Sequence, residues 1–310
     1  MAKQKLVLIG NGMAGIRTIE EILERSDSTF DITVIGKEPY PNYNRIMLSN
    51  ILQNKMTIDD TIMNPFDWYK AHDINLIIDD PVEHVNREGQ YVVTSKGLTV
   101  SYDICIFATG SSAFVLPIPG ADLPSVIGWR TIKDTEQMMT IAQTKKRAVV
   151  IGGGLLGLEC ARGLLDQGME VTVLHLADWL MEMQLDAKAG ALLKADLEQQ
   201  GMKIELQANS QEIIGQDDVE AIKLADGRVI ETDLIVMAVG IRPYVQVARD
   251  AGLEVNRGIV VNDYLQTSDA HIYAVGECAE HQGHVYGLVA PLYEQGKVLA
   301  DYLTGRKTEG

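Results

Sequence analysis

Two glycine-rich segments of the same form constrain this chain more than any other feature of its sequence. Residues 10–15 read GNGMAG and residues 152–157 read GGGLLG, and each segment follows a short apolar run and precedes a helix-like stretch. In such a G-x-G-x-x-G pattern, the first glycine permits a tight strand-to-helix turn and the third lets the helix pack closely on the strand. The middle glycine lets the backbone approach a pyrophosphate at the helix N-terminus. The sequence therefore predicts two clamps for two dinucleotides. The predicted contacts are Gly10, Gly12, Met13, Ala14 and Gly15 in the first clamp and Gly152, Gly154, Leu155, Leu156 and Gly157 in the second.

The rest of the chain alternates between strand-like and helix-like stretches, which predicts an α/β fold of two Rossmann-like domains with parallel sheets. Crossings are expected around residues 111–124 and after residues 240–243 because both stretches carry proline and glycine. The second domain, residues 116–242, is then inserted into the first, which comprises residues 1–115 and 243–310. The runs that read as buried strands are Leu6–Ile9, Ile32–Ile35, Ile104–Ala108, Ala148–Ile151, Val171–Leu174, Leu234–Val239 and Ile272–Val275.

Composition and charge exclude several classes of function. The 310 residues carry a formal net charge of −16, so the clustered Lys and Arg of a nucleic-acid surface are lacking. The first apolar run is too short for a signal peptide or a membrane span, which predicts a cytoplasmic protein without a membrane partner. The three cysteines, Cys105, Cys160 and Cys278, show no CxxC spacing, and reduced thiols are expected.

An acid about 20 residues beyond each clamp is expected to hold a ribose. After the first clamp, Gly36 stands where that acid is usual, and Glu38 is the nearest carboxylate. After the second clamp, the strand is followed by His175, with Asp178 further on. No arginine follows this strand closely, so NADH is favoured over NADPH. The alternative is a protonated His175 beside the phosphate of NADPH.

Two further motifs carry a resemblance to a known family. Residues 102–110 (YDICIFATG) resemble the ATG segment of flavoproteins that bind two dinucleotides, and residues 267–277 (TSDAHIYAVGE) resemble their second FAD signature. With the two clamps, the order of motifs is similar to that of the FAD-dependent pyridine nucleotide oxidoreductases over nearly the whole chain. Within that superfamily, residues 41–49, 152–159 and 285–296 most resemble the N-terminal part of assimilatory NAD(P)H nitrite reductase large subunits and the related nitrate reductase electron-transfer subunits.

The resemblance implies FAD in the first clamp and NADH, or alternatively NADPH, in the second. It implies hydride transfer to FAD and electron transfer onward to a redox protein or to an iron–sulfur or siroheme module. Relatives continue into an interface domain, whereas this chain stops at Gly310. That domain is therefore expected to be absent, and the chain to be a fragment or a reductase that serves another protein. Three scattered cysteines do not supply a four-thiolate cluster site.

The resemblance also implies roles for single residues. Arg45 and Glu159 are the predicted catalytic residues, the first along the flavin and the second as a gate to hydride transfer. The lysine that pairs with this glutamate in relatives is missing near Asn50. Glu277 is predicted to hold the ribityl hydroxyls. The other predicted FAD contacts are Glu38, Asn44, Arg45, Val82, Ala108, Thr109, Gly110, Arg130, Gly276, Leu292 and Tyr293, and those of the nicotinamide dinucleotide are His175, Val239 and Gly240.

Three of these predicted site residues also have a purely structural interpretation. A glutamate in the first turn of a helix, as Glu159 is expected to be, is favoured by the helix dipole alone. Arg45 fits a solvated loop, and Glu277 fits a helix or turn cap. Cys278, His281 and His284 have the spacing of zinc ligands but lack a fourth ligand, so no metal is predicted.

The sequence favours one function over two alternatives, and it disfavours the disulfide reductase among these. The leading one is an FAD-dependent NAD(P)H oxidoreductase that is the electron-input module of nitrite or nitrate assimilation. A thiol-dependent disulfide reductase needs a cysteine beside the flavin, where this chain has Asn44, Arg45 and Ile46. A sensor or scaffold that binds FAD and NADH without turnover uses the same clamps.

Overall fold

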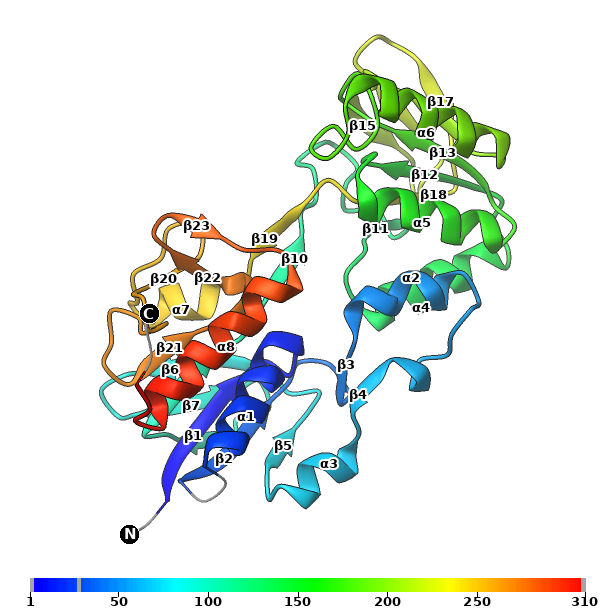
Figure 1. Ribbon diagram of the computed structural model, residues 1–310. Helices are drawn as coiled ribbons and strands as arrows, with labels where there is room; N and C mark the ends of the chain where they lie inside the picture. The colour runs from blue at the N-terminus through cyan, green and yellow to red at the C-terminus, as the bar shows by residue number, and fades with distance from the viewer. Residues whose placement is uncertain (1–2, 27–28, 308–310) are drawn as a thin grey trace. The chain divides into compact units, whose positions relative to one another are not determined.

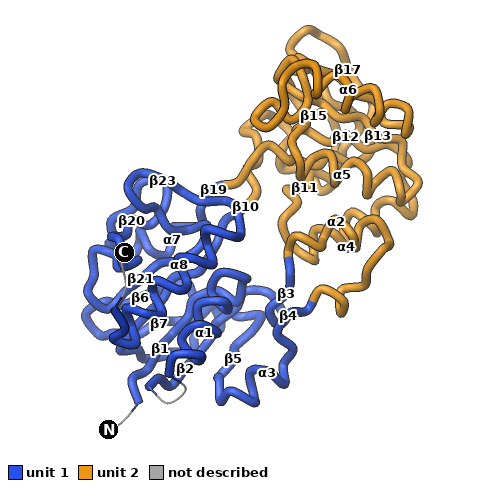
Figure 2. Tube along the Cα trace, viewed as in Figure 1, with its two compact units in different colours: residues 1–44, 62–111, 242–310 blue, residues 45–61, 112–241 orange. Residues whose placement is uncertain are grey.

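The computed structural model describes residues 3–26 and 29–307, and these fall into two compact units. Unit 1 comprises residues 1–44, 62–111 and 242–310, and unit 2 comprises residues 45–61 and 112–241 (Figure 2). The chain passes between them next to β10 (Ser111–Ala113) and β19 (Ile241–Pro243), which form a two-stranded sheet.

Unit 1 is built on a five-stranded parallel sheet in the order β21-β9-β1-β2-β5 (Figure 1). Its central strand β1 is buried along its apolar half, as expected for a strand covered on both faces. The strands of the sheet are β1 (Gln4–Ile9), β2 (Phe30–Ile35), β5 (Asn75–Ile77), β9 (Ile104–Phe107) and β21 (Ile272–Ala274). The other elements of unit 1 are α1 (Met13–Arg25), β3 (Asn42–Tyr43), β4 (Ile62–Asn64), α3 (Phe66–Ala71), β6 (Val82–Asn86), β7 (Tyr91–Thr94), β8 (Thr99–Ser101), α7 (Gln246–Asp250), β20 (Ile259–Val261), a 3₁₀ turn (Gly276–Cys278), β22 (Ala279–His281), β23 (His284–Val285) and α8 (Val289–Leu303).

Unit 2 repeats this plan with the parallel order β11-β18-β12-β13-β14. In both units the strand before the glycine segment is central, and the next strand in the chain pairs beside it. The strands of the second sheet are β11 (Val126–Gly128), β12 (Arg147–Ile151), β13 (Glu170–Leu174), β14 (Lys203–Glu205) and β18 (Leu234–Met237). Unit 2 also contains 3₁₀ turns (Arg45–Met47 and Asp59–Thr61), α2 (Leu48–Leu52), α4 (Ile132–Ala142), α5 (Leu155–Asp166), α6 (Ala187–Gln199), β15 (Ser210–Ile214), β16 (Ala221–Leu224) and β17 (Val229–Glu231). The predicted class of two Rossmann-like α/β domains is confirmed.

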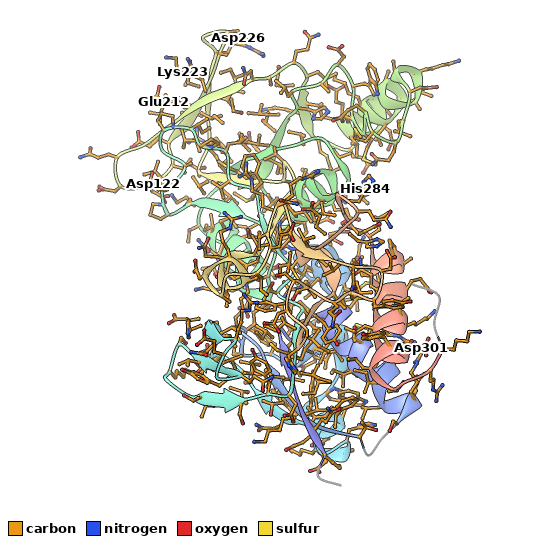
Figure 3. All side chains as sticks on the ribbon, turned by 90° about the vertical axis from the view of Figure 1, so that its left-hand side faces the viewer. Asp122, Glu212, Lys223, Asp226, His284 and Asp301 are labelled. Carbon is orange, nitrogen blue, oxygen red and sulfur yellow. The ribbon has the colours of Figure 1, made fainter. Side chains whose placement is uncertain are left out.

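In each unit a three-stranded antiparallel sheet is inserted in the chain just before the strand that pairs with the other edge of the central strand, β9 in unit 1 and β18 in unit 2. The order is β6-β7-β8 in unit 1 and β15-β16-β17 in unit 2. In the second of these, Glu212 lies opposite Lys223, and both are labelled in Figure 3 with Asp226 of the following turn. The two units therefore share the same core plan of a parallel sheet with an inserted antiparallel sheet.

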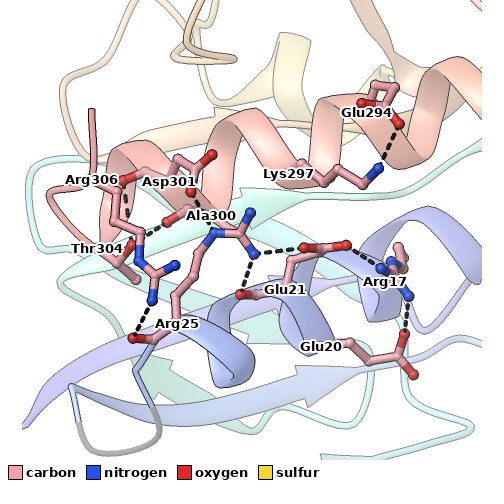
Figure 4. Close-up of polar contacts among 10 residues, drawn as sticks. All are labelled: Arg17, Glu20, Glu21, Arg25, Glu294, Lys297, Ala300, Asp301, Thr304 and Arg306. Carbon is pink, nitrogen blue, oxygen red and sulfur yellow. Dashed lines mark hydrogen bonds and ion pairs between the residues drawn. The ribbon is translucent and has the colours of Figure 1, made fainter. Parts of the chain in front are cut away.

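Helices α1 and α8 of unit 1 pack side by side and are joined by a chain of ion pairs (Figures 1 and 4). Glu21, nearly fully buried, accepts from Arg17 and from Arg25 Nη1 (2.6 Å), and Arg25 Nε donates to Asp301 of α8 (2.6 Å). Burial alone would raise the pKa of Glu21, but the two guanidinium groups hold it below its usual value. This network fixes α8 along the helix that begins at the first clamp.

Asp218 of unit 2 ties together three separate segments. Its carboxylate accepts from the backbone N–H of Ser125 (3.1 Å) and Val219 (2.8 Å) and pairs with Lys145 Nζ (2.8 Å). Burial alone would raise the pKa of Asp218, but these donors lower it from 3.8 to about 2. A depressed carboxyl pKa stabilises the fold above the unfolded pKa, and this stabilisation disappears as the pH falls from about 4 towards about 2.

The substitution Asp218→Asn is therefore expected to lower the free energy of unfolding at pH 7 by about 1 kcal/mol, since partial exposure screens the ion pair. Urea unfolding of the FAD-loaded protein, repeated from pH 7 down to pH 3, measures this effect. The difference from wild type should narrow below about pH 4. Asp217→Asn, at the exposed neighbouring position, is the matched control and is expected to change little. A difference that is constant with pH would contradict the role of the carboxylate charge.

One segment accounts for the largest difference from the predicted domain boundaries; at the crossings, residues 112–115 cluster with unit 2 and Arg242 with unit 1. Residues 45–61, placed by the sequence in the first domain, cluster with unit 2. The reason is packing between α2 and α5: a Cβ on Gly163 would lie 2.6 Å from Leu52 Cγ, and Gln167 Nε2 donates to Leu52 O (2.7 Å). In the described part of the chain, no helix is long and apolar enough to cross a membrane.

Candidate functional site

The first glycine segment forms a cradle at the carboxyl end of β1. Gly10 has φ +114°, and its N–H donates to Ile35 O (2.8 Å). A Cβ on Gly10 would lie 2.2 Å from Ala108 O, so only glycine fits between β1 and the residue after β9. A Cβ on Gly15 would meet the Cβ of Ala108 at 2.8 Å, so the third glycine lets α1 approach the sheet.

The second glycine segment has the same geometry in unit 2. Gly152 has φ +119°, donates to Leu174 O (2.8 Å), and a Cβ there would lie 2.3 Å from Ala238 O. A Cβ on Gly157 would lie 1.9 Å from Gly152 O. The two segments therefore form equivalent turns between the central strand and its helix.

Both cradles are open at the middle glycine. A Cβ built on Gly12 or on Gly154 would have no atom of the described residues within 4 Å. Gly12 and Gly154 are also the N-caps of α1 and α5, and neither helix has a capping side chain or an acid in its first turn. Backbone N–H groups and the positive end of the helix dipole therefore face open space, which is the chemistry that holds a phosphate.

The two predicted FAD signatures meet beside the first cradle. Thr109 Oγ1 donates to Tyr244 O (2.6 Å), and Tyr244 N–H donates to Gly110 O (2.9 Å). Gly276 approaches the start of α1, since a Cβ there would lie 3.0 Å from Ala14 Cβ. Glu277 accepts from Ser111 Oγ (2.7 Å). Val82 is the buried first residue of β6.

Helix α8 supplies two of the predicted contacts from its first turns. Leu292 is buried, and the ring of Tyr293 lies below the guanidinium of Arg17 at 5.7 Å. Gln295, one turn further, accepts from Gly276 N–H (2.8 Å) and so ties the second FAD signature to α8. Gln295 was not among the predicted contacts, because a glutamine in a helix carries no motif of its own.

A polar network behind the first cradle was also missed. Asn11 Oδ1 accepts from Tyr69 OH (2.8 Å), Asn11 Nδ2 donates to Tyr40 O (3.2 Å), and Asn42 Nδ2 donates to Asn11 O (3.2 Å). Burial raises the pKa of Tyr69 to about 12, so its hydroxyl is a stable donor. The only sequence feature that pointed to this network is the amide side chain of Asn11, between the first two glycines of the clamp.

The acid predicted for the first ribose is displaced from the strand end. A Cβ on Gly36 would lie 2.9 Å from Asn11 Cβ, so no side chain fits there. Glu38 follows, and its carboxylate accepts from Tyr43 OH (2.8 Å). In unit 2 the strand-end residue is His175, whose Nδ1 accepts from Gly153 N–H (3.0 Å). Asp178 accepts from Gln207 Nε2 (2.6 Å).

The predicted catalytic residues lie in unit 2. Arg45 Nη1 donates to Arg130 O (3.0 Å), whereas Asn44 belongs to unit 1. Glu159 is the fifth residue of α5, so the expectation that it lies in the first turn is wrong. Burial raises the pKa of Glu159, and an interaction with the Ser49 hydroxyl opposes this. Of the remaining predicted contacts, Leu155 and Leu156 are exposed at the open N-terminus of α5, and Val239 and Gly240 follow β18.

The three cysteines and the histidines of the zinc-like spacing have other surroundings in the described residues. All three thiols are free and buried, and burial raises the pKa of Cys105, Cys160 and Cys278. His281 Nε2 pairs with Asp263 Oδ1 (2.8 Å). Over residues 3–26 and 29–307, no group of three or more His, Cys, Asp or Glu side chains is placed to hold a metal.

Comparison with known proteins identifies the family. The family model described as pyridine nucleotide-disulphide oxidoreductase matches residues 4–296. The chain is 55% identical over 309 residues to nitrite reductase [NAD(P)H] of Bacillus subtilis and 51% identical over 305 residues to the assimilatory nitrate reductase electron transfer subunit of the same organism. These matches cover 100% and 98% of this chain.

A solved structure agrees with this result. The fold matches a ferredoxin reductase of Rhodopseudomonas palustris with a TM-score of 0.90 and 29% identity, over 98% of this chain and 76% of that one. The chain spans only 38% and 40% of the length of the two curated Bacillus relatives. The predicted class of NAD(P)H-dependent flavoprotein oxidoreductase is confirmed at the level of the family. With its two cradles and this match over nearly its whole length, the chain belongs to the pyridine nucleotide-disulphide oxidoreductase family.

Proposed function

We propose that this chain is an FAD-dependent NADH reductase that passes electrons to an iron–sulfur or comparable redox centre, as the electron-input module of nitrite or nitrate assimilation. The observation that carries the proposal is the pair of equivalent cradles, each open at its middle glycine and each lined by uncapped backbone N–H groups. Together the bound cofactors supply hydride transfer from nicotinamide C4 to flavin N5.

In unit 1 the residues fit FAD. The backbone N–H groups of residues 12–15 would hold the pyrophosphate, Glu38 the adenosine ribose, and Glu277 the ribityl chain. The N-terminus of α8, which begins at Val289, would stabilise negative charge at the flavin N1 and C2 carbonyl, with Leu292 and Tyr293 in its first turns. Gln295 and the ion pairs between α1 and α8 hold these groups in place.

In unit 2 the residues fit the nicotinamide dinucleotide. The N–H groups at the start of α5 would hold its pyrophosphate. Arg45, which donates to Arg130 O, and Glu159, which interacts with the Ser49 hydroxyl, are the side chains of unit 2 proposed as catalytic residues. The protein supplies position and exclusion of water, and no nucleophile is required.

The acceptor is proposed from the relatives. Two are named as a nitrite reductase and a nitrate reductase electron transfer subunit, and the matched structure is a ferredoxin reductase. One NADH reduces two one-electron acceptors and releases NAD⁺ and one proton. A thiol-dependent disulfide reductase has less support, because each cysteine is buried with a raised pKa. We propose a cytoplasmic location, which the free thiols and NADH as donor support.

Anaerobic stopped-flow mixing of the FAD-loaded protein with NADH tests the proposal. The oxidised-flavin absorbance should bleach within the time of one turnover, and ferredoxin, rubredoxin or ferricyanide should then restore it. A protein that binds both cofactors but keeps its yellow colour would be a sensor and not a reductase. A protein that takes up no FAD would overturn the proposal entirely.

A further inference from the structure

A histidine in unit 2 links the second cradle to the loop after β13. His175, only 7% exposed, accepts through Nδ1 from the N–H of Gly153, the variable residue of the cradle (3.0 Å). Its Nε2 lies 3.0 Å from Glu182 Oε2. Because a backbone N–H donates to Nδ1, the ring proton is on Nε2 and is donated to the carboxylate.

Glu182 is therefore an anion held at the rim of the cradle. Its side chain is 37% exposed. His175 is its only polar partner in the part of the chain that the structure describes, so Oε1 remains available. The other acids near this strand end are occupied: Asp178 accepts from Gln207, and Glu205 pairs with Arg228 Nη1 (2.6 Å).

The position of this carboxylate matters because NADH and NADPH differ only at the 2′ position of the adenosine ribose. A carboxylate accepts a hydrogen bond from the 2′-hydroxyl and repels a 2′-phosphate. We propose that Glu182, positioned by His175, reads this 2′ position and selects NADH over NADPH. This inference rests on the proposed function, since it requires a nicotinamide dinucleotide in the second cradle.

A steric feature explains why the acid is displaced from the strand end. A Cβ on Gly153 would lie 2.7 Å from His175 Cγ, so the imidazole occupies the space beside the cradle. In unit 1 the large and small residues are exchanged: the side chain of Asn11, in the cradle, occupies the space beside Gly36 at the strand end. In neither unit does an acid stand directly after the strand, and in each a carboxylate from further along takes up a hydrogen bond near the cradle.

The test varies the charge at position 182 from −1 to 0 to +1 with Glu182→Gln and Glu182→Arg. The measured quantity is the ratio of the dissociation constants of NADP⁺ and NAD⁺ for the FAD-loaded protein, obtained by calorimetry and independent of flavin reduction. Wild type should favour NAD⁺ at least about tenfold. Glu182→Gln should lower the ratio about tenfold, and Glu182→Arg about tenfold further.

Asp178→Asn is the matched control, because it removes one carboxylate charge from the same loop. It should change the ratio less than about twofold. His175→Ala tests the positioning role: it should lower the ratio, whereas a purely structural role would weaken both dinucleotides equally. Binding of both dinucleotides with a ratio that Glu182→Gln leaves unchanged would overturn this inference alone. Binding of neither by wild type would overturn the proposed function as well.

Discussion

Gly10→Ala is expected to remove FAD from the protein and to destabilise unit 1 by on the order of 3 kcal/mol. The single added carbon would lie 2.2 Å from Ala108 O, and the backbone at φ +114° is one that an L side chain rarely adopts. Neither strand can retreat, since Ala108 N–H donates to Ile9 O (2.8 Å) and β1 pairs with strands on both sides. Thermal unfolding and the flavin absorbance of the purified variant measure both effects.

Gly12→Ala is the control that separates folding from cofactor binding. It adds the same carbon two residues later, where φ is −90° and no described atom lies within 4 Å. Its unfolding midpoint without FAD should match wild type, while its affinity for FAD should fall about tenfold or more because the methyl group occupies the phosphate side of the cradle. If Gly12→Ala bound FAD as tightly as wild type, the first cradle would not be the pyrophosphate site.

Much of this architecture was predictable from the sequence because the central strands are buried on both faces. The run at residues 6–9 lies within β1, and the run at residues 148–151 lies within β12, each followed by its glycine segment. Continuous apolar stretches of this kind are what a doubly covered parallel strand requires. The edge strands β5 and β14 have three residues each and are partly exposed, so no apolar run marked them.

The site was less predictable from the sequence at positions where side-chain volume, or a hydrogen bond to a distant segment, determines which residue fits. Gly36 was conspicuous only as a missing acid, and the structure shows that Asn11 fills the space that a side chain would need. Likewise, His175 suggested a cation beside a phosphate, whereas its Nδ1 accepts from Gly153 N–H. Neither relation has a sequence signature, because each joins residues more than 20 positions apart whose complementary sizes appear only after folding.

Gly154→Asp is expected to abolish binding of the nicotinamide dinucleotide while leaving the fold intact. Gly154 is the N-cap of α5 with φ −85° and ψ −178°, an extended conformation that any residue adopts. Aspartate is among the best N-cap residues and would accept from the free N–H groups of the first turn. Unit 2 should therefore be as stable as wild type or slightly more stable. The same carboxylate would occupy the phosphate position with negative charge, and the dissociation constant of NADH should rise at least about 100-fold.

Gly154→Ser separates the effect of negative charge from the effect of a side chain that fills the phosphate position. The serine hydroxyl also caps the helix but carries no charge. NADH should bind this variant about tenfold more weakly than wild type, between the wild type and Gly154→Asp. Both variants should keep FAD, since the first cradle belongs to unit 1, and dithionite should reduce that FAD as in wild type. Only reduction by NADH should fail. If Gly154→Asp were reduced by NADH at the wild-type rate and affinity, unit 2 would hold its dinucleotide elsewhere, because a fixed carboxylate and a pyrophosphate cannot share one helix N-terminus.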